Sequence, residues 1–180
     1  MADPGRRGIL AILACAVILG AVNYAIAGKQ RLLSEGRVVY LRLAPVDPRS
    51  LMQGDYMALN YEVAREIRNA LPYSADGGAD ERRFADGRVV VSVSPAGVAE
   101  FRRIRDDALA GLHPLGEDEI LMRYRLRNGD VKFATNAYFF QEGTSSLYEP
   151  ARYGVFRVSE DGELLLTGMA DENLETLGPD

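Results

Sequence analysis

Hydrophobic residues follow three patterns along this chain, and each pattern predicts a different kind of element. The first is Gly8–Gly28, an uninterrupted run of uncharged and mostly apolar residues. Its length, about 20 residues, suffices for one helical crossing of a membrane. Arg6 and Arg7 precede the run, and we expect the helix to continue past Lys29 and to end at Gly36.

The second pattern is a strict alternation of apolar and polar residues, which is the period of a strand with one buried face. It predicts about eight strands, joined mostly by tight turns. The strongest turn signal is Asn128-Gly129, which is typical of a two-residue hairpin. The predicted strands are Arg37–Leu43, Asp55–Val63, Arg88–Ser94, Val98–Arg105, Glu119–Arg127, Val131–Gln141, Tyr153–Ser159 and Glu163–Ala170.

Two of these assignments depend on the neighbouring turns. Val98–Arg105 also fits a helix, but the short turn at residues 95–97 favours a hairpin with Arg88–Ser94. Val131–Gln141 is predicted as the hairpin partner of Glu119–Arg127.

The third pattern is amphipathic, and it predicts a short helix over Ala64–Leu71. The loop at residues 142–150 has room for one more helical turn, and we expect the acidic tail 171–180 to be frayed. The fold class is therefore mainly β. An N-terminal transmembrane helix, within residues 1–35, precedes an antiparallel β barrel or sandwich over residues 36–180, with one or two short helices.

The apolar N-terminal segment has three interpretations, of which we favour an uncleaved signal anchor. A cleaved signal peptide is the alternative, because Ala25-Ile26-Ala27 has the small-x-small form of a cleavage site. A lipoprotein signal ending at Cys15 is disfavoured, because apolar residues continue well beyond it. Positive charges flank both ends of the segment, so the positive-inside rule does not decide its orientation.

The very short N-terminal tail behaves like that of a signal sequence, which sends the large domain out of the cytoplasm. We therefore expect a single-pass protein of the cell membrane with its main domain extracytoplasmic, in the periplasm. Cleavage after Ala27 would instead release the domain to the periplasm.

Residues 45–61, PVDPRSLMQGDYMALNY, predict a turn that leads into a strand. Gly54 permits a backbone conformation that is closed to other residues. Asp55 then lies at the entry edge of an apolar face, where an ionised carboxylate needs a partner, and Arg49 is the nearest candidate. We interpret Asp55 either as a turn residue that caps this loop or as a carboxylate at the edge of a site.

The string Gly54-Asp55-Tyr56-x-x-Leu59-x-Tyr61 resembles the signature of the bacterial GDYXXLXY family, which is named for it. Residues 45–49, 138–144 and 148–154 are similar to the same family, so the resemblance covers nearly the whole chain after the first helix. It implies a membrane-associated protein of unestablished activity with an extracytoplasmic domain. The candidate binding or motif residues are Asp47, Arg49, Gly54, Asp55, Tyr56, Leu59, Tyr61, Phe140, Glu142, Gly143, Tyr148, Glu149 and Tyr153.

Several of these residues fall on a loop that follows an aromatic strand, and loops carry function more often than strands do. We expect this loop, around Glu142, and the turn that ends at Asp55 to lie at the same end of the domain and to build one surface.

The composition of the chain limits the partners and the kinds of site that we expect. The formal charge of −5 argues against a nucleic-acid partner. The single cysteine lies in the apolar segment and His113 is the only histidine, so we predict no metal, no cofactor and no catalytic residue.

The leading prediction for function is an accessory or interaction module. It would meet the membrane through residues 8–28 and would bind another membrane or envelope protein. Two alternatives stay open. One is a hydrolase that uses carboxylates such as Asp55 with Glu142, or a Ser50/Lys132 pair. The other is a small-ligand or glycan-binding module with a concave site lined by Tyr56, Tyr138 and Tyr148.

Overall fold

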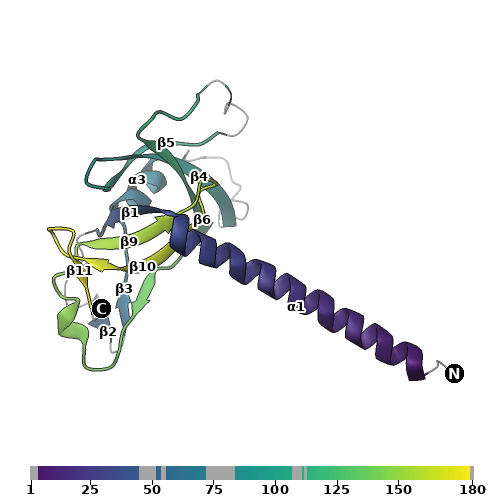
Figure 1. Ribbon diagram of the computed structural model, residues 1–180. Coiled ribbons are helices and arrows are strands. Elements are labelled where there is room, and N and C mark those ends of the chain that lie inside the picture. The colour runs from purple at the N-terminus through teal and green to yellow at the C-terminus, as the bar shows by residue number, and fades with distance from the viewer. Residues whose placement is uncertain are drawn as a thin grey trace. The chain divides into compact units, whose positions relative to one another are not determined.

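The computed structural model describes residues 4–44, 52–53, 56–71, 84–106, 111 and 113–178. The chain divides into two compact units, Met1–Glu35 and Gly36–Asp180. The first unit contains helix α1 (Pro4–Glu35), which ends directly before Gly36, as predicted (Figure 1). Its part Ile12–Glu35 is long and apolar enough to cross a membrane, although a signal sequence would meet the same criterion.

The second unit is mainly β, which confirms the predicted fold class. Its described strands form three sheets with the orders β1-β9-β10-β11, β2-β3-β8 and β5-β4-β6-β7, and every pair of neighbouring strands is antiparallel. The elements described are β1 (Arg37–Arg42), β2 (Met52–Gln53), β3 (Tyr56–Ala58), α3 (Glu62–Ala70), β4 (Phe84–Val93), β5 (Ala99–Ile104), β6 (Glu119–Arg127), β7 (Asp130–Lys132), β8 (Ala137–Phe139), η2 (Ser145–Leu147), β9 (Tyr153–Val158), β10 (Leu164–Ala170) and β11 (Thr176–Leu177).

The hairpins predicted at residues 95–97 and at Asn128-Gly129 are confirmed, and a third hairpin joins β9 to β10. β5 returns along β4, β7 returns along β6, and β10 returns along β9. At the second turn Asn128 and Gly129 have φ angles of 53° and 81°. Positive φ at both central residues is what a type I′ hairpin turn requires, and Asn-Gly adopts it at little cost.

The two four-stranded sheets are curled half-barrels, and backbone contacts join them at two places. At the first place Tyr40 of β1 bridges to Val98, and its N–H donates to the Gly97 carbonyl at 2.9 Å. At the second place Arg123 of β6 donates its N–H to the carbonyl of Gly162, in the β9–β10 turn, at 2.8 Å. Helix α3 contacts β5, β7 and β1 and buries Val63, Ala64 and Ile67 against the same core (Figure 1).

The predicted strand Asp55–Val63 is much shorter than expected. Only Tyr56–Ala58 is a strand, and α3 begins at Glu62. Met57, Leu59 and Tyr61 face the core, as the alternation predicts, while Val63 is buried on the inner face of the helix instead. A buried helix position therefore continued the strand-like pattern by coincidence.

The prediction of one partner strand over Val131–Gln141 is also wrong, because this segment contains parts of two short strands, β7 and β8. β7 ends at Lys132, and the chain then leaves β6 so that β8 pairs with β3. The side chain of Thr135 makes the bend, since its Oγ1 donates to the Ala137 carbonyl at 2.9 Å and accepts the Ala137 N–H at 3.2 Å. Such local side-chain bonds offer the backbone an alternative to the sheet ladder.

The acidic tail is ordered over its described part, contrary to expectation. Asp171 Oδ1 accepts the N–H groups of Asn173 and Glu175, each at 2.9 Å, and thereby closes a turn. The chain then forms β11, which pairs with the end of β10. Because Asp171 closes this turn, the polar segment after it is directed back along β10 and can pair with it as a strand.

One ion pair links β5 to β6 across the strand β4 that lies between them. Arg103 of β5 donates two hydrogen bonds to the Glu119 carboxylate of β6, at 2.5 and 2.8 Å, and the Gly116 N–H donates a third at 3.0 Å. The Arg103 guanidinium and then the Gly116 amide lower the pKa of Glu119 to about 2.

We predict that Glu119→Gln lowers the free energy of unfolding by about 1–2 kcal/mol at neutral pH, because a charge-assisted bidentate contact is lost. Since the folded-state pKa lies below the ordinary value of 4.5, the wild-type contribution is full above about pH 5 and disappears as the pH falls through about 2. Urea unfolding of the full-length protein at several pH values measures this difference. Glu117→Gln, at an exposed position nearby, is the control; equal losses in the two variants would contradict the prediction.

Candidate functional site

The motif residues that the structure describes divide between the core and the surface. Leu59 and Tyr61 are each 1% exposed, whereas the side chain of Tyr56 is partly exposed on β3. Four candidates that precede them, Asp47, Arg49, Gly54 and Asp55, lie outside the described residues, and their roles stay predictions.

The ring of Tyr61 is packed edge-on against two phenylalanines. Its centroid lies 5.8 Å from that of Phe133 and 5.5 Å from that of Phe156. Gly154 makes room for the ring, since a Cβ at that glycine would lie 3.1 Å from it. The Tyr61 hydroxyl is buried and has no hydrogen-bond partner among the residues described, and its burial raises the pKa far above the ordinary value.

A second aromatic cluster surrounds Tyr148, which is 5% exposed. Phe140 stacks on its ring and Tyr138 meets it edge-on, both with centroids 5.2 Å apart. Burial, followed by a hydrogen bond and a charge interaction with Tyr148, raises the pKa of Tyr138 to about 12. A Cβ at Gly178 would lie 2.6 Å from the Tyr148 hydroxyl, so the C-terminal segment covers this cluster closely.

Tyr153 is also a core residue. It is 4% exposed, the Arg42 guanidinium lies over its ring at 4.9 Å, and Tyr40 meets it edge-on at 6.4 Å. Tyr148 and Tyr153 therefore contact protein on their faces and edges, which argues against a ligand site lined by Tyr148.

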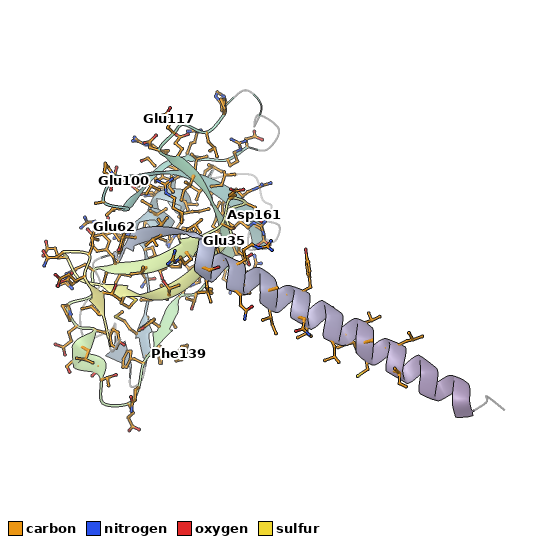
Figure 2. All side chains as sticks on the ribbon, in the orientation of Figure 1. Glu35, Glu62, Glu100, Glu117, Phe139 and Asp161 are labelled. Atoms are coloured by element: carbon orange, nitrogen blue, oxygen red, sulfur yellow. The ribbon has the colours of Figure 1, made fainter. Side chains whose placement is uncertain are left out.

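Among the described residues of the domain, one aromatic side chain is prominent on the surface. Phe139 of β8 is 73% exposed, and its ring lies 5.7 Å from that of Tyr56, its directly paired partner in β3. Figure 2 shows its side chain projecting away from the ribbon. We call Tyr56 and Phe139 the Tyr56–Phe139 patch.

The predicted polar loop follows this patch directly. Glu142, Gly143 and Glu149 are exposed, and η2 provides the one helical turn that was expected. Because Tyr56 pairs with Phe139, the start of β3 lies beside the end of β8, where this loop begins. Asp55 itself is not among the described residues, so the shared surface of Asp55 and Glu142 stays a prediction.

The sequence pattern predicts Phe140 as a candidate residue and does not single out Phe139. Adjacent residues in a strand point to opposite sides, so only one of the two could be buried. The aromatic run itself was the available signal, but it does not show which ring faces outward.

The residues proposed for hydrolysis are only partly described. Lys132 Nζ lies 3.7 Å from Asp130 Oδ2 in an exposed ion pair, and Ser50 lies outside the described residues. Among the described residues, no group of three or more His, Cys, Asp or Glu side chains could hold a metal ion.

The described carboxylate whose pKa is raised lies elsewhere, on α3. Burial first, and then the charges of Glu62 and Glu100, raise the pKa of Glu66, while the backbone N–H of Phe101 opposes them. These three side chains belong to an acidic face formed by α3 and β5.

The comparisons with known proteins give one result. The family model described as GDYXXLXY protein matches residues 18–169. No curated protein and no solved structure matches the chain.

We predict that Tyr61→Phe raises the free energy of unfolding by about 1 kcal/mol, because a buried hydroxyl without a partner costs desolvation energy. Tyr148→Phe removes the same atom but also its interaction with Tyr138, and should lower the free energy of unfolding by about 0.5–1.5 kcal/mol. Urea unfolding of both full-length variants measures the contrast. A loss of stability in Tyr61→Phe would show that its hydroxyl has a partner in solution.

Proposed function

The chain belongs to the GDYXXLXY family, and from that premise we propose that it is a membrane-anchored accessory protein. Helix α1 crosses the membrane once, and the β domain lies on the extracytoplasmic side, where it binds another protein of the cell envelope. The Tyr56–Phe139 patch is the surface that meets this partner.

The exposure of Phe139 is the observation that carries this proposal. Isolated apolar side chains are common on protein surfaces and need no explanation. Among the described residues of the domain, Phe139 is the most exposed large apolar side chain, and its ring contacts Tyr56, the first tyrosine of the family motif. Aromatic side chains of this kind are enriched among the residues that dominate binding energy at protein interfaces.

The distribution of the motif residues supports a binding role. Leu59 and Tyr61 build the core, and Tyr56 presents a ring at the surface beside Phe139. In this arrangement the buried part of the motif holds β3 in place, and β3 holds the patch. No chemical step is required of any of these side chains.

The membrane crossing has its own test. We predict that the protein extracted from native membranes keeps the full mass of 19.8 kDa, because α1 is retained as an anchor. Protease added to intact spheroplasts should digest the β domain, while a cytoplasmic control protein survives. A shortened mass that corresponds to cleavage after Ala27 would contradict the anchor, and a protected domain would contradict the orientation.

The docking surface is tested by Phe139→Ser. We predict that a membrane protein captured by the full-length wild type from detergent-solubilised membranes is recovered at least about 10-fold less with this variant, because an aromatic anchor is lost. Leu115→Ser is the matched control, since Leu115 is also exposed, at 40%, but lies outside the patch. Circular dichroism establishes that both variants are folded; equal capture by all three proteins would refute the docking surface.

A further inference from the structure

Asn23 is a polar residue in an apolar setting. It is the one carboxamide in Gly8–Gly28, and that run contains no charge. It lies six residues before Lys29, which is about 9 Å along a helix axis and therefore within the hydrocarbon layer of a bilayer.

The helix itself satisfies only part of the Asn23 side chain. One amide N–H of Asn23 donates to the Leu19 carbonyl at 2.8 Å. Its Oδ1 and its other amide hydrogen have no partner among the residues described. Lipid tails offer neither donors nor acceptors, so these groups gain a partner in the membrane only from another polar group.

Asn23 shares one face of α1 with three small residues, Ala16, Gly20 and Ala27. Spacings of four, three and four residues place these side chains one above another on an α-helix. All four residues are exposed, and nothing lies within 4 Å of the position that a Cβ would take at Gly20. Small residues let the backbone of a second helix approach closely, which brings a carboxamide within hydrogen-bonding reach of its partner.

We propose that α1 pairs in the membrane with α1 of a second copy of this chain, through the face formed by Ala16, Gly20, Asn23 and Ala27. This inference rests on the proposed membrane crossing. Two copies insert with the same orientation, so their Asn23 side chains lie at the same depth.

The occupant of this face follows from the chemistry of Asn23. A carboxamide carries both donors and an acceptor, so two copies at the same depth satisfy each other. The face carries no charge, so the two copies do not repel each other. An apolar helix of another protein in this place would leave the Asn23 carboxamide without a partner.

Cysteine cross-linking of the full-length protein in native membranes tests the pairing. In a Cys15→Ala background, Gly20→Cys and Ala27→Cys should give a disulfide-linked product of twice the chain mass. Ile18→Cys and Ala25→Cys lie on the opposite face of the helix and should give little. Resonance energy transfer between labelled full-length chains in phosphatidylcholine vesicles then measures the affinity.

In the vesicles, Asn23→Leu should raise the dissociation constant about 3- to 30-fold, which is the range expected for interhelical hydrogen bonds in membranes. Asn23→Gln should restore part of the affinity because it keeps the carboxamide. Ile18→Leu, an apolar change on the opposite face, should leave the affinity unchanged.

Equal cross-linking at all four positions, no product of double mass, or an unchanged affinity in Asn23→Leu would overturn the pairing. A cross-linked product with a different membrane protein in place of the double-mass species would also overturn it. If full-length chains stay monomeric in the membrane, the helix pairing is wrong but the proposed membrane anchor is unaffected. Recovery of chains cleaved after Ala27 contradicts both the pairing and the anchor.

Discussion

The domain depends most on the burial of Tyr61, because four segments distant in sequence meet at this residue. Its backbone bridges to Leu43 after β1, and it caps the start of α3 in an extended conformation. Its ring contacts Phe133, beyond β7, and Phe156 of β9, and it fits over Gly154. The last tyrosine of the family motif therefore connects the segment after β1, the start of α3, the segment beyond β7 and strand β9, at the cost of a buried hydroxyl.

The elements predicted well from sequence are those that local rules determine. The hairpin at Asn128-Gly129 and the end of α1 before Gly36 each follow from a few adjacent residues. The sheet β2-β3-β8 was missed because β3 and β8 are far apart in sequence and only three residues long. Alternation says which residues of a strand share a face, but it does not say which distant strand will pair with it.

The arrangement of the aromatic candidates also depends on a contact between segments that are distant in sequence. The aromatic run at residues 138–140 was recognised as unusual, but the pairing of β8 with β3 decides that Phe139 faces outward while Phe140 packs on Tyr148. Tyr148 looked like a loop residue available for binding. The C-terminal segment buries it, and that segment had been expected to be frayed.

Phe139 and Asn23 share a physical feature, since the polarity of each side chain is opposite to that of its surroundings. One is an aromatic ring in water, and the other is a carboxamide in a segment suited to lipid. They belong to different compact units, so the loss of one contact should leave the other intact. If both contacts form, two chains joined through their α1 helices carry two Tyr56–Phe139 patches. A partner with two matching sites would then bind more tightly than either patch alone allows, because the second contact forms at high effective concentration.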